Sequence, residues 1–385
     1  MSRRRLFLHI GCHKTGTTSI QHALANNLAA LTDHGLTFFY ENCQTGELQL
    51  PDLHSWINFV ETDRIVPHGM HVLKPRKLAQ KLAMISGDVV ISSENFSFFF
   101  EQQYIDSLCD SLTSVFDDIQ IICYLRRQDR HVVSHHQEGA KLYRKAEYDL
   151  FGHSTRAIPH YQLKHGLYLN YDHRIGMWAH AFGKSSINIR IFDRSVLKNG
   201  DTVADFFGLL GINEFKKLGD WNFSMGIFET KIGHLINGAR LTHDDFLVRL
   251  CRRTLKDSRK IRPSRREARE YYAHFIDGNR ALNAKFSVTS YDALFDQDFS
   301  DYPEDAADHW TENDANEVIL SLLKIIDQHY AKLSADDLRD AALGIAGNKP
   351  EIAVKLMRLA HFLRPEGELI KRKLAELEDI TDARE

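Results

Sequence analysis

The sequence predicts an α/β fold, with a central parallel sheet and flanking helices, followed by a helical C-terminal appendage. Five short apolar runs rich in β-branched residues have the composition of buried parallel strands, at 6–10, 36–40, 89–92, 119–125 and 187–192. Segments with helical periodicity separate these runs, at 17–31, 75–86, 101–115, 128–146 and 201–212. Alternation of strands and helices is typical of an α/β domain built on a parallel sheet.

The composition changes near residue 334, so we expect the α/β domain to cover 1–333 and a separate helical extension to cover 334–385. Alanines and leucines at helical spacing predict three short helices in the extension, at 338–345, 353–363 and 369–377. This pattern resembles a single tetratricopeptide-like helical unit. One unit has no neighbouring repeat to stack on, so we expect it to pack on the main domain or on a partner.

Composition and charge narrow the class of protein. The chain has 385 residues, 43% of them hydrophobic and 26% charged, as in an ordinary globular protein. A formal net charge of −3 gives no overall positive field, which argues against a nucleic-acid partner.

The sequence also indicates where the protein is located. No apolar run reaches the length of about 18 residues that a membrane span needs. The five cysteines are odd in number and never form a C-x-x-C pair, which favours a reducing, cytoplasmic location. The sequence does not predict the oligomeric state.

A loop at 11–18 follows the first predicted strand and leads into the first predicted helix. It combines glycines and hydroxyl side chains with one lysine, Lys14, and such a loop can hold a phosphate at a helix N-terminus. In a Walker A loop the lysine follows the last glycine, whereas Lys14 precedes Gly16. No predicted strand ends in an aspartate that would hold magnesium. A kinase of the P-loop type is therefore the alternative rather than the leading hypothesis.

A second phosphate-binding pattern follows the predicted strand 119–125. Arg126 ends this strand, and Ser134 lies eight residues further on, two turns into the next helix. A guanidinium and a hydroxyl in this arrangement can clamp one phosphate between them. The sequence therefore predicts two anion sites.

Together the two patterns resemble the bacterial branch of the sulfotransferases that use 3′-phosphoadenosine 5′-phosphosulfate (PAPS). The likeness extends over residues 1–300 and is strongest at the two motifs. It implies a P-loop-like fold, PAPS as co-substrate and no required metal. It also implies that the K-[TS]-G-T-[TS] motif binds the 5′-phosphosulfate and that Arg126 and Ser134 bind the 3′-phosphate. The residues that match the first motif are Lys14, Thr15, Gly16, Thr17 and Thr18. His13 in the same loop either touches the sulfonate or shapes the turn.

Sulfonate transfer needs a cation at the leaving phosphate oxygen and a base for the proton of the acceptor. Lys14 is predicted to supply the cation. Three residues are candidate bases: Glu94 after the strand 89–92, Glu41 after the strand 36–40, and His54. Glu94 can instead cap the helix that follows it, Glu41 can be an exposed loop acid, and His54 can be a packed or surface residue. Glu94 is the first choice among the three, although the sequence does not fix it.

The acceptor is the least determined part of the prediction. The segment 143–178 is rich in aromatic and basic residues, and 249–269 is strongly basic. If these segments line a cleft, they suit a small-molecule or glycan acceptor, and a glycan is the preferred prediction. Otherwise they form an ordinary surface. A non-catalytic interaction protein that uses its helical tail is the alternative outside the enzymes.

Overall fold

The computed structural model describes most of the chain, and its elements form two units, 1–309 and 310–385. The composition-based boundary at 333/334 instead falls after helix α14 (Glu312–Tyr330), which belongs to the second unit. The described residues are 3–42, 48–49, 58–61, 65–68, 74–141, 145–217, 219, 225–239, 247, 249–251, 255, 257–330 and 333–382.

The first unit is built on a five-stranded sheet with the order β2-β7-β1-β8-β9, in which every neighbouring pair is parallel. The strands are β1 (Arg5–His9), β2 (Leu36–Phe38), β7 (Asp88–Ser92), β8 (Asp118–Leu125) and β9 (Ile187–Ile191). The predicted α/β fold and the five predicted strands are confirmed. Leu8 of β1 lies opposite Ile91 on one side and Ile121 on the other. The loop after β1 therefore emerges at the middle of the sheet.

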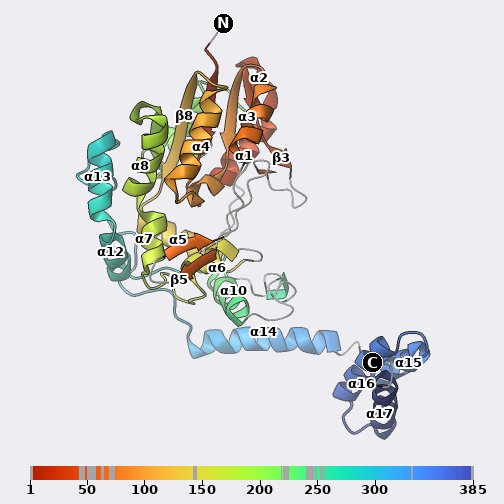
Figure 1. The fold of residues 1–385 in the computed structure, drawn as a ribbon. Helices are drawn as coiled ribbons and strands as arrows, with labels where there is room; N and C mark the ends of the chain where they lie inside the picture. The colour runs from red at the N-terminus through yellow and green to blue at the C-terminus, as the bar shows by residue number, and fades with distance from the viewer. Residues whose placement is uncertain are drawn as a thin grey trace. The chain divides into compact units, whose positions relative to one another are not determined.

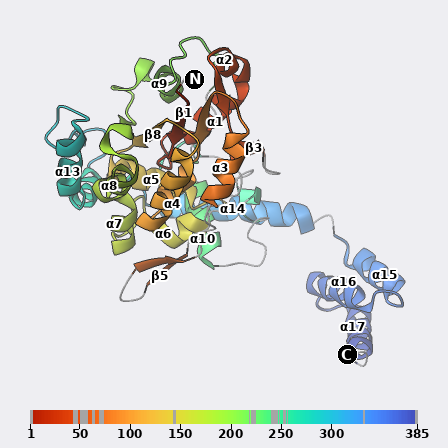
Figure 2. The ribbon, with the colours of Figure 1, turned by 45° about the horizontal axis from the view of Figure 1, so that its top comes forward.

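Both faces of the sheet are covered, which explains why its strands are apolar on both sides. Leu6 and Leu8 point to a core formed with α3, α4 and α8. Phe7 points to the opposite core, formed with α1 and α9. Helices α3, α4 and α8 lie side by side along one face (Figures 1 and 2). The covering helices are α1 (Thr17–Asn26), α3 (Pro75–Ala83), α4 (Gln102–Thr113), α8 (Tyr171–Phe182) and α9 (Thr202–Leu209).

The central strand should dominate the stability of this unit. Leu8 is 0% exposed, so Leu8→Ala is expected to lower the free energy of unfolding by about 3 kcal/mol, through lost burial and the cavity left behind. Leu28→Ala is the matched control, because Leu28 is 43% exposed. Its expected cost is below about 1 kcal/mol. Urea unfolding followed by fluorescence measures both variants, and equal losses would contradict the prediction.

Two predicted helices are divided in the structure. The segment 17–31 breaks at Asn27, where α1 ends and α2 (Leu28–Asp33) begins. The Asn27 side chain donates to the Ala23 carbonyl at 2.8 Å and accepts the Lys216 amide at 2.6 Å, so it ties the break to a distant segment. The segment 128–146 corresponds to α5 (Gln128–Glu138) and the start of α6 (Lys145–Phe151).

The first unit contains further strands and helices outside the five-stranded sheet and its covering helices. Two antiparallel pairs, which the sequence did not predict, are β3 (Glu41–Asn42) with β4 (Leu48–Gln49) and β5 (Asn58–Glu61) with β6 (Ile65–His68). The further helices are α7 (Leu163–Leu169), α10 (Ile227–Ala239), α12 (Arg265–Ala273) and α13 (Ile276–Phe286), with 3₁₀ turns η1 (Glu94–Phe98), η2 (Lys184–Ser186) and η3 (Lys198–Gly200).

The second unit is helical, as predicted for the C-terminal region. After α14 come α15 (Ala335–Ile345), α16 (Pro350–Leu363) and α17 (Glu368–Asp382). Helices α15, α16 and α17 share a small core in which Ala342, Ala353 and Met357 are 0% exposed. The small side chains of Ala342 and Ala353 let the helices approach closely. Across the described parts of both units, no helix combines the length and apolar character needed to cross a membrane.

Candidate functional site

The loop between β1 and α1 is strongly curled. Gly11, Lys14 and Gly16 have φ angles of 97°, 61° and 83°, so three of its residues adopt the left-handed region. At Gly11 a side chain would also collide, because a Cβ there would lie 2.7 Å from the Ser97 hydroxyl oxygen. Among the described residues, no side chain caps the N-terminus of α1, where backbone amides point out of the helix. This geometry suits an anion.

The threonines of this loop have different roles. Thr15 is 0% exposed and its hydroxyl donates to the Cys12 carbonyl at 2.5 Å, so its side chain stabilises the turn. Thr17 donates to the same carbonyl at 3.2 Å but also lines a cavity, together with Thr18. Of the predicted loop residues, Thr15 therefore has only its main chain to offer a ligand.

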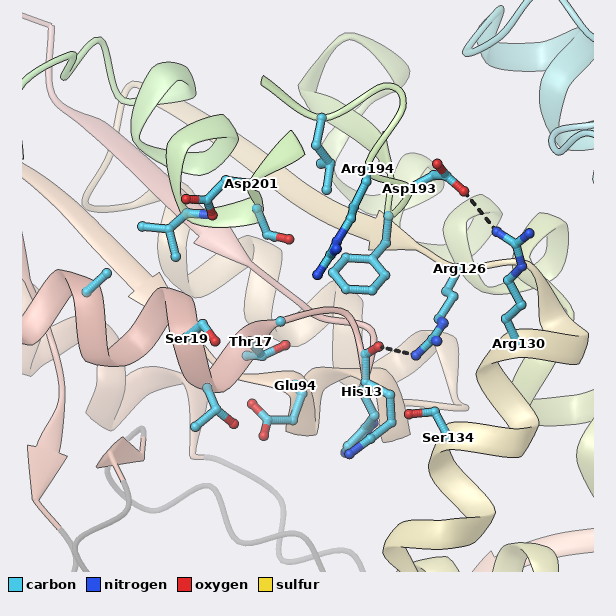
Figure 3. Close-up of a pocket in the computed structure, with 18 of the residues that line it drawn as sticks. His13, Thr17, Ser19, Glu94, Arg126, Arg130, Ser134, Asp193, Arg194 and Asp201 are labelled. Carbon is cyan, nitrogen blue, oxygen red and sulfur yellow. Dashed lines mark hydrogen bonds and ion pairs between the residues drawn. The ribbon is translucent and has the colours of Figure 1, made fainter. Parts of the chain in front are cut away.

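The two sequence motifs meet in space. Arg126, just after β8, donates from Nη1 to the carbonyl of Lys14 at 3.2 Å. Its guanidinium carbon also lies 5.5 Å from the centroid of the Phe192 ring. Ser134 projects from α5 toward the same space, opposite Thr17 (Figure 3). Residues more than 100 positions apart in the chain thus form one site, because β1 and β8 are neighbours in the sheet.

A cavity of about 1080 Å³ opens over this junction. Its wall includes every predicted donor-site residue except Thr15, namely His13, Lys14, Gly16, Thr17, Thr18, Arg126 and Ser134. Two groups that the sequence reasoning did not select also line it. The additional cations are Arg130, Lys141, Arg194 and Lys217, and the additional carboxylates are Glu138, Glu147, Asp193 and Asp201.

Lys14 forms an ion pair inside this cavity. Its Nζ lies 2.7 Å from Glu138 Oε2 on α5, and Lys141 Nζ lies 2.9 Å from the same oxygen. Burial lowers the pKa of Lys14 below the usual lysine value, and the attraction of Glu138 offsets part of that shift. Burial alone would raise the pKa of Glu138, but Lys14 and Lys141 outweigh it and lower that pKa from 4.5 to about 2.

Glu138 was missed in the sequence, although a signal was present. It follows Ser134 by four residues on a predicted helix, and residues at that spacing share a helix face. A face that carries Ser134 to the cavity therefore carries Glu138 to the same side.

The lowered pKa of Glu138 predicts a pH-dependent contribution to stability. A carboxyl group with a depressed pKa in the folded state stabilises above its unfolded pKa and loses that effect as the pH falls. With values of 4.5 unfolded and about 2 folded, the effect is present above pH 4.5 and disappears toward pH 2. Glu138→Gln should therefore cost on the order of 3 kcal/mol near pH 7, and the difference from wild type should shrink across this window.

Urea unfolding at a series of pH values tests this, with Glu351→Gln at an exposed helical position as the control. A difference between wild type and Glu138→Gln that stays constant from pH 7 to pH 3 would contradict the assignment.

Of the three predicted bases, Glu94 lies at the cavity. Its Cα packs beside Gly11, and its Oε2 accepts a hydrogen bond from Gln21 Nε2 at 3.1 Å. It does not cap the following 3₁₀ turn, because Ser93 Oγ accepts the Asn95 amide instead. Glu41 lies in β3 with its side chain outside the described residues, and His54 lies outside them entirely.

In the described part of the segment 143–178, three large aromatic side chains lie in the core rather than along a cleft. Tyr168 and Tyr171 are 0% and 1% exposed, and Trp178 is 2% exposed. These rings pack in the core, where burial of large apolar side chains is most favourable. Among the described residues of this segment, Glu147 is the one that lines the cavity. The described residues also contain no group of three His, Cys, Asp or Glu side chains arranged to hold a metal ion.

We compared the chain with known protein families, sequences and structures, and none of the matches identifies its function. No protein-family model matches the chain. An uncharacterized protein of Archaeoglobus fulgidus is 32% identical over 94 residues, which are 24% of this chain and 23% of that protein. The chain thus aligns with about a quarter of that relative's length. The crystal structure of a sulfotransferase from Alicyclobacillus acidocaldarius is similar at 14% identity with a TM-score of 0.38, covering 74% of this chain and 96% of that one. A TM-score this low does not by itself support a shared activity.

Proposed function

We propose that this protein transfers a sulfonate group from PAPS to a hydroxyl or amine acceptor. One observation carries the proposal: the loop after β1 and the Arg126/Ser134 pair line a single cavity and are joined by a hydrogen bond. PAPS carries one anionic group at its 5′ end and another at its 3′ position, which matches two anion sites in one cavity. ATP has no 3′-phosphate to place beside Arg126.

The proposed reaction proceeds by attack of the acceptor oxygen or nitrogen on sulfur. The bond between sulfur and the bridging phosphate oxygen breaks, and adenosine 3′,5′-bisphosphate leaves. Negative charge develops on that oxygen, so donors placed there stabilise the transition state more than the ground state. Lys14 supplies the cation, and the N-terminus of α1 supplies backbone amides and the positive end of its dipole.

We further propose a glycan as the acceptor. Support comes from the part of the cavity wall outside the donor loop, where Glu94, Gln137 and Glu147 offer hydrogen-bond acceptors and donors of the kind that bind sugar hydroxyls. The cavity of about 1080 Å³ is also at the upper end of the range for small-molecule sites, as needed for a nucleotide and a second ligand. A cytoplasmic location stays a prediction from cysteine usage.

Titration calorimetry tests the donor, with adenosine 3′,5′-bisphosphate titrated in EDTA and ATP titrated both in EDTA and with excess magnesium. We expect adenosine 3′,5′-bisphosphate to bind and ATP not to bind. Binding of ATP with magnesium, and none of the bisphosphate, would favour the kinase alternative. Failure of both nucleotides to bind would favour an interaction protein.

A panel of glycans, phenols and peptides with ³⁵S-labelled PAPS tests the acceptor class. Label is expected in the glycans. Label in other acceptors and none in glycans would overturn the acceptor class while leaving the reaction in place.

A further inference from the structure

The segment that follows β9 carries an arginine into the cavity. Arg194 lines this space, and Figure 3 shows its side chain extending toward the start of α1, where Thr17 lies. The turn that carries it is held by Asp193, whose Oδ1 accepts the Ser195 amide at 2.9 Å and the Ser195 hydroxyl at 2.7 Å. Arg194 is therefore an exposed side chain on an ordered main chain.

Arg194 differs from two other cations of the cavity wall, each of which is paired with a carboxylate. Arg130 Nη1 lies 2.9 Å from Asp193 Oδ2. Lys141 Nζ lies 2.9 Å from Glu138 Oε2. Within the described ranges, the Arg194 side chain forms no ion pair and no hydrogen bond. A guanidinium group stays charged at neutral pH, so this charge is available to a ligand.

The segment that carries Arg194 packs directly over the loop between β1 and α1. A Cβ atom added at Gly16 would lie 3.3 Å from the methyl carbon and from the hydroxyl oxygen of Thr202. It would also lie 3.4 Å from Cε2 of Phe192. Phe192 and Thr202 stand on either side of Arg194 in the chain, so this contact places the segment beside the N-terminus of α1.

Two helices begin at this part of the cavity, and they differ in their caps. Asp201 caps α9, because its Oδ1 accepts the Val203 amide at 2.8 Å. The N-cap residue of α1 is Gly16, which has no side chain to accept a hydrogen bond. The start of α1 is thus the end that presents unsatisfied backbone amides to an anion.

Charge balance at this end requires a cation besides Lys14. The 5′-phosphosulfate of PAPS carries two negative charges, one on the phosphate and one on the sulfonate. A helix N-terminus contributes about half a positive charge. Lys14, Lys141 and Glu138 together contribute one, because the carboxylate cancels one of the two ammonium charges. The guanidinium of Arg194 supplies the further positive charge.

We infer that Arg194 binds the 5′-phosphate of the donor, together with the backbone amides at the start of α1. This inference rests on the proposed sulfonate transfer, because it assigns one more residue to the donor of that reaction. Arg194 contacts the non-bridging oxygens, which are charged before the transfer and after it. Lys14 acts on the bridging oxygen, where charge develops. Arg194 is therefore a binding residue for the donor, with little part in the chemical step.

Three adenosine phosphates distinguish this assignment from binding of the 3′-phosphate. Adenosine 5′-monophosphate has only the 5′ group, adenosine 3′-monophosphate has only the 3′ group, and the 3′,5′-bisphosphate has both. Calorimetry, with competition against the bisphosphate for weak ligands, measures all three on wild type, Arg194→Met and Arg194→Lys. Arg266→Met, at an exposed position on α12, is the matched control.

Arg194→Met is expected to weaken binding of the bisphosphate and of adenosine 5′-monophosphate about 10- to 100-fold, through loss of a charge-assisted hydrogen bond. Adenosine 3′-monophosphate should bind as it does to wild type. Arg194→Lys should give intermediate affinities, because an ammonium group keeps the charge but not the planar, two-pronged geometry. Arg266→Met should bind all three ligands like wild type.

Unchanged affinity of Arg194→Met for the bisphosphate and for adenosine 5′-monophosphate would overturn the inference. So would a loss confined to the two ligands with a 3′-phosphate, or an equal loss for all three. A higher KM for the acceptor with unchanged nucleotide affinity would assign Arg194 to the acceptor instead. Failure of wild type to bind the bisphosphate would overturn the proposed function itself.

Single-turnover transfer from labelled PAPS gives a second readout that a merely structural role would not produce. Arg194→Met should raise the PAPS concentration at half-maximal rate by the same factor as it weakens bisphosphate binding. The maximal rate should stay within about threefold of wild type, because the lost contact is made in the ground state and in the transition state alike. A lower maximal rate at an unchanged half-maximal concentration would contradict the inference.

Discussion

Lys14→Ala is expected to lower the rate of sulfonate transfer about a thousandfold, because it removes the one loop cation available to the leaving phosphate oxygen. The loss should fall mainly on kcat, since charge develops at that oxygen only in the transition state. Single-turnover transfer from labelled PAPS measures it. Lys184→Ala is the control, at an exposed position in η2. A Lys14→Ala variant that keeps more than about a tenth of the wild-type rate would remove Lys14 from the mechanism.

Arg126→Met should act on binding rather than on chemistry. A charge-assisted hydrogen bond to a phosphate is worth about 1.5–3 kcal/mol, so affinity for adenosine 3′,5′-bisphosphate should fall about 10- to 100-fold. Adenosine 5′-monophosphate lacks the 3′-phosphate, and its affinity should hardly change. Calorimetry with both ligands gives the ratio, and Arg280→Met, an exposed position on α13, serves as the control. An equal loss for both nucleotides would place Arg126 elsewhere in the site.

The sheet was predictable because its strands are buried on both faces. Runs such as 6–10 and 119–125 are apolar throughout, and that signal does not depend on their neighbours in space. Helix boundaries were less predictable. The break at Asn27 comes from a side chain that bonds to Lys216, a partner almost 190 residues away, and no local pattern carries that information.

That the loop after β1 lies beside Arg126 was predictable from the parallel sheet. Carboxyl ends of neighbouring parallel strands meet at one edge, so the loop after β1 and Arg126 after β8 had to approach each other. The rest needed three dimensions. The aromatic and basic composition of 143–178 indicated a binding surface, but burial decided otherwise for Tyr168 and Tyr171. The contact between the Tyr171 hydroxyl and His131 depends on how α8 packs beside α5.

The hydrogen bond from Arg126 to the Lys14 carbonyl has a consequence for how a donor is discriminated. The residue proposed to hold the far phosphate also fixes the main chain of the residue proposed to act at the reacting end. A ligand that binds Arg126 therefore also helps to order the main chain at Lys14. A ligand that binds Arg126 weakly leaves the loop less well ordered for the transfer. The 3′-phosphate would then contribute to the alignment of the sulfonate as well as to affinity. Nucleotides would be selected by their rate of transfer in addition to their binding.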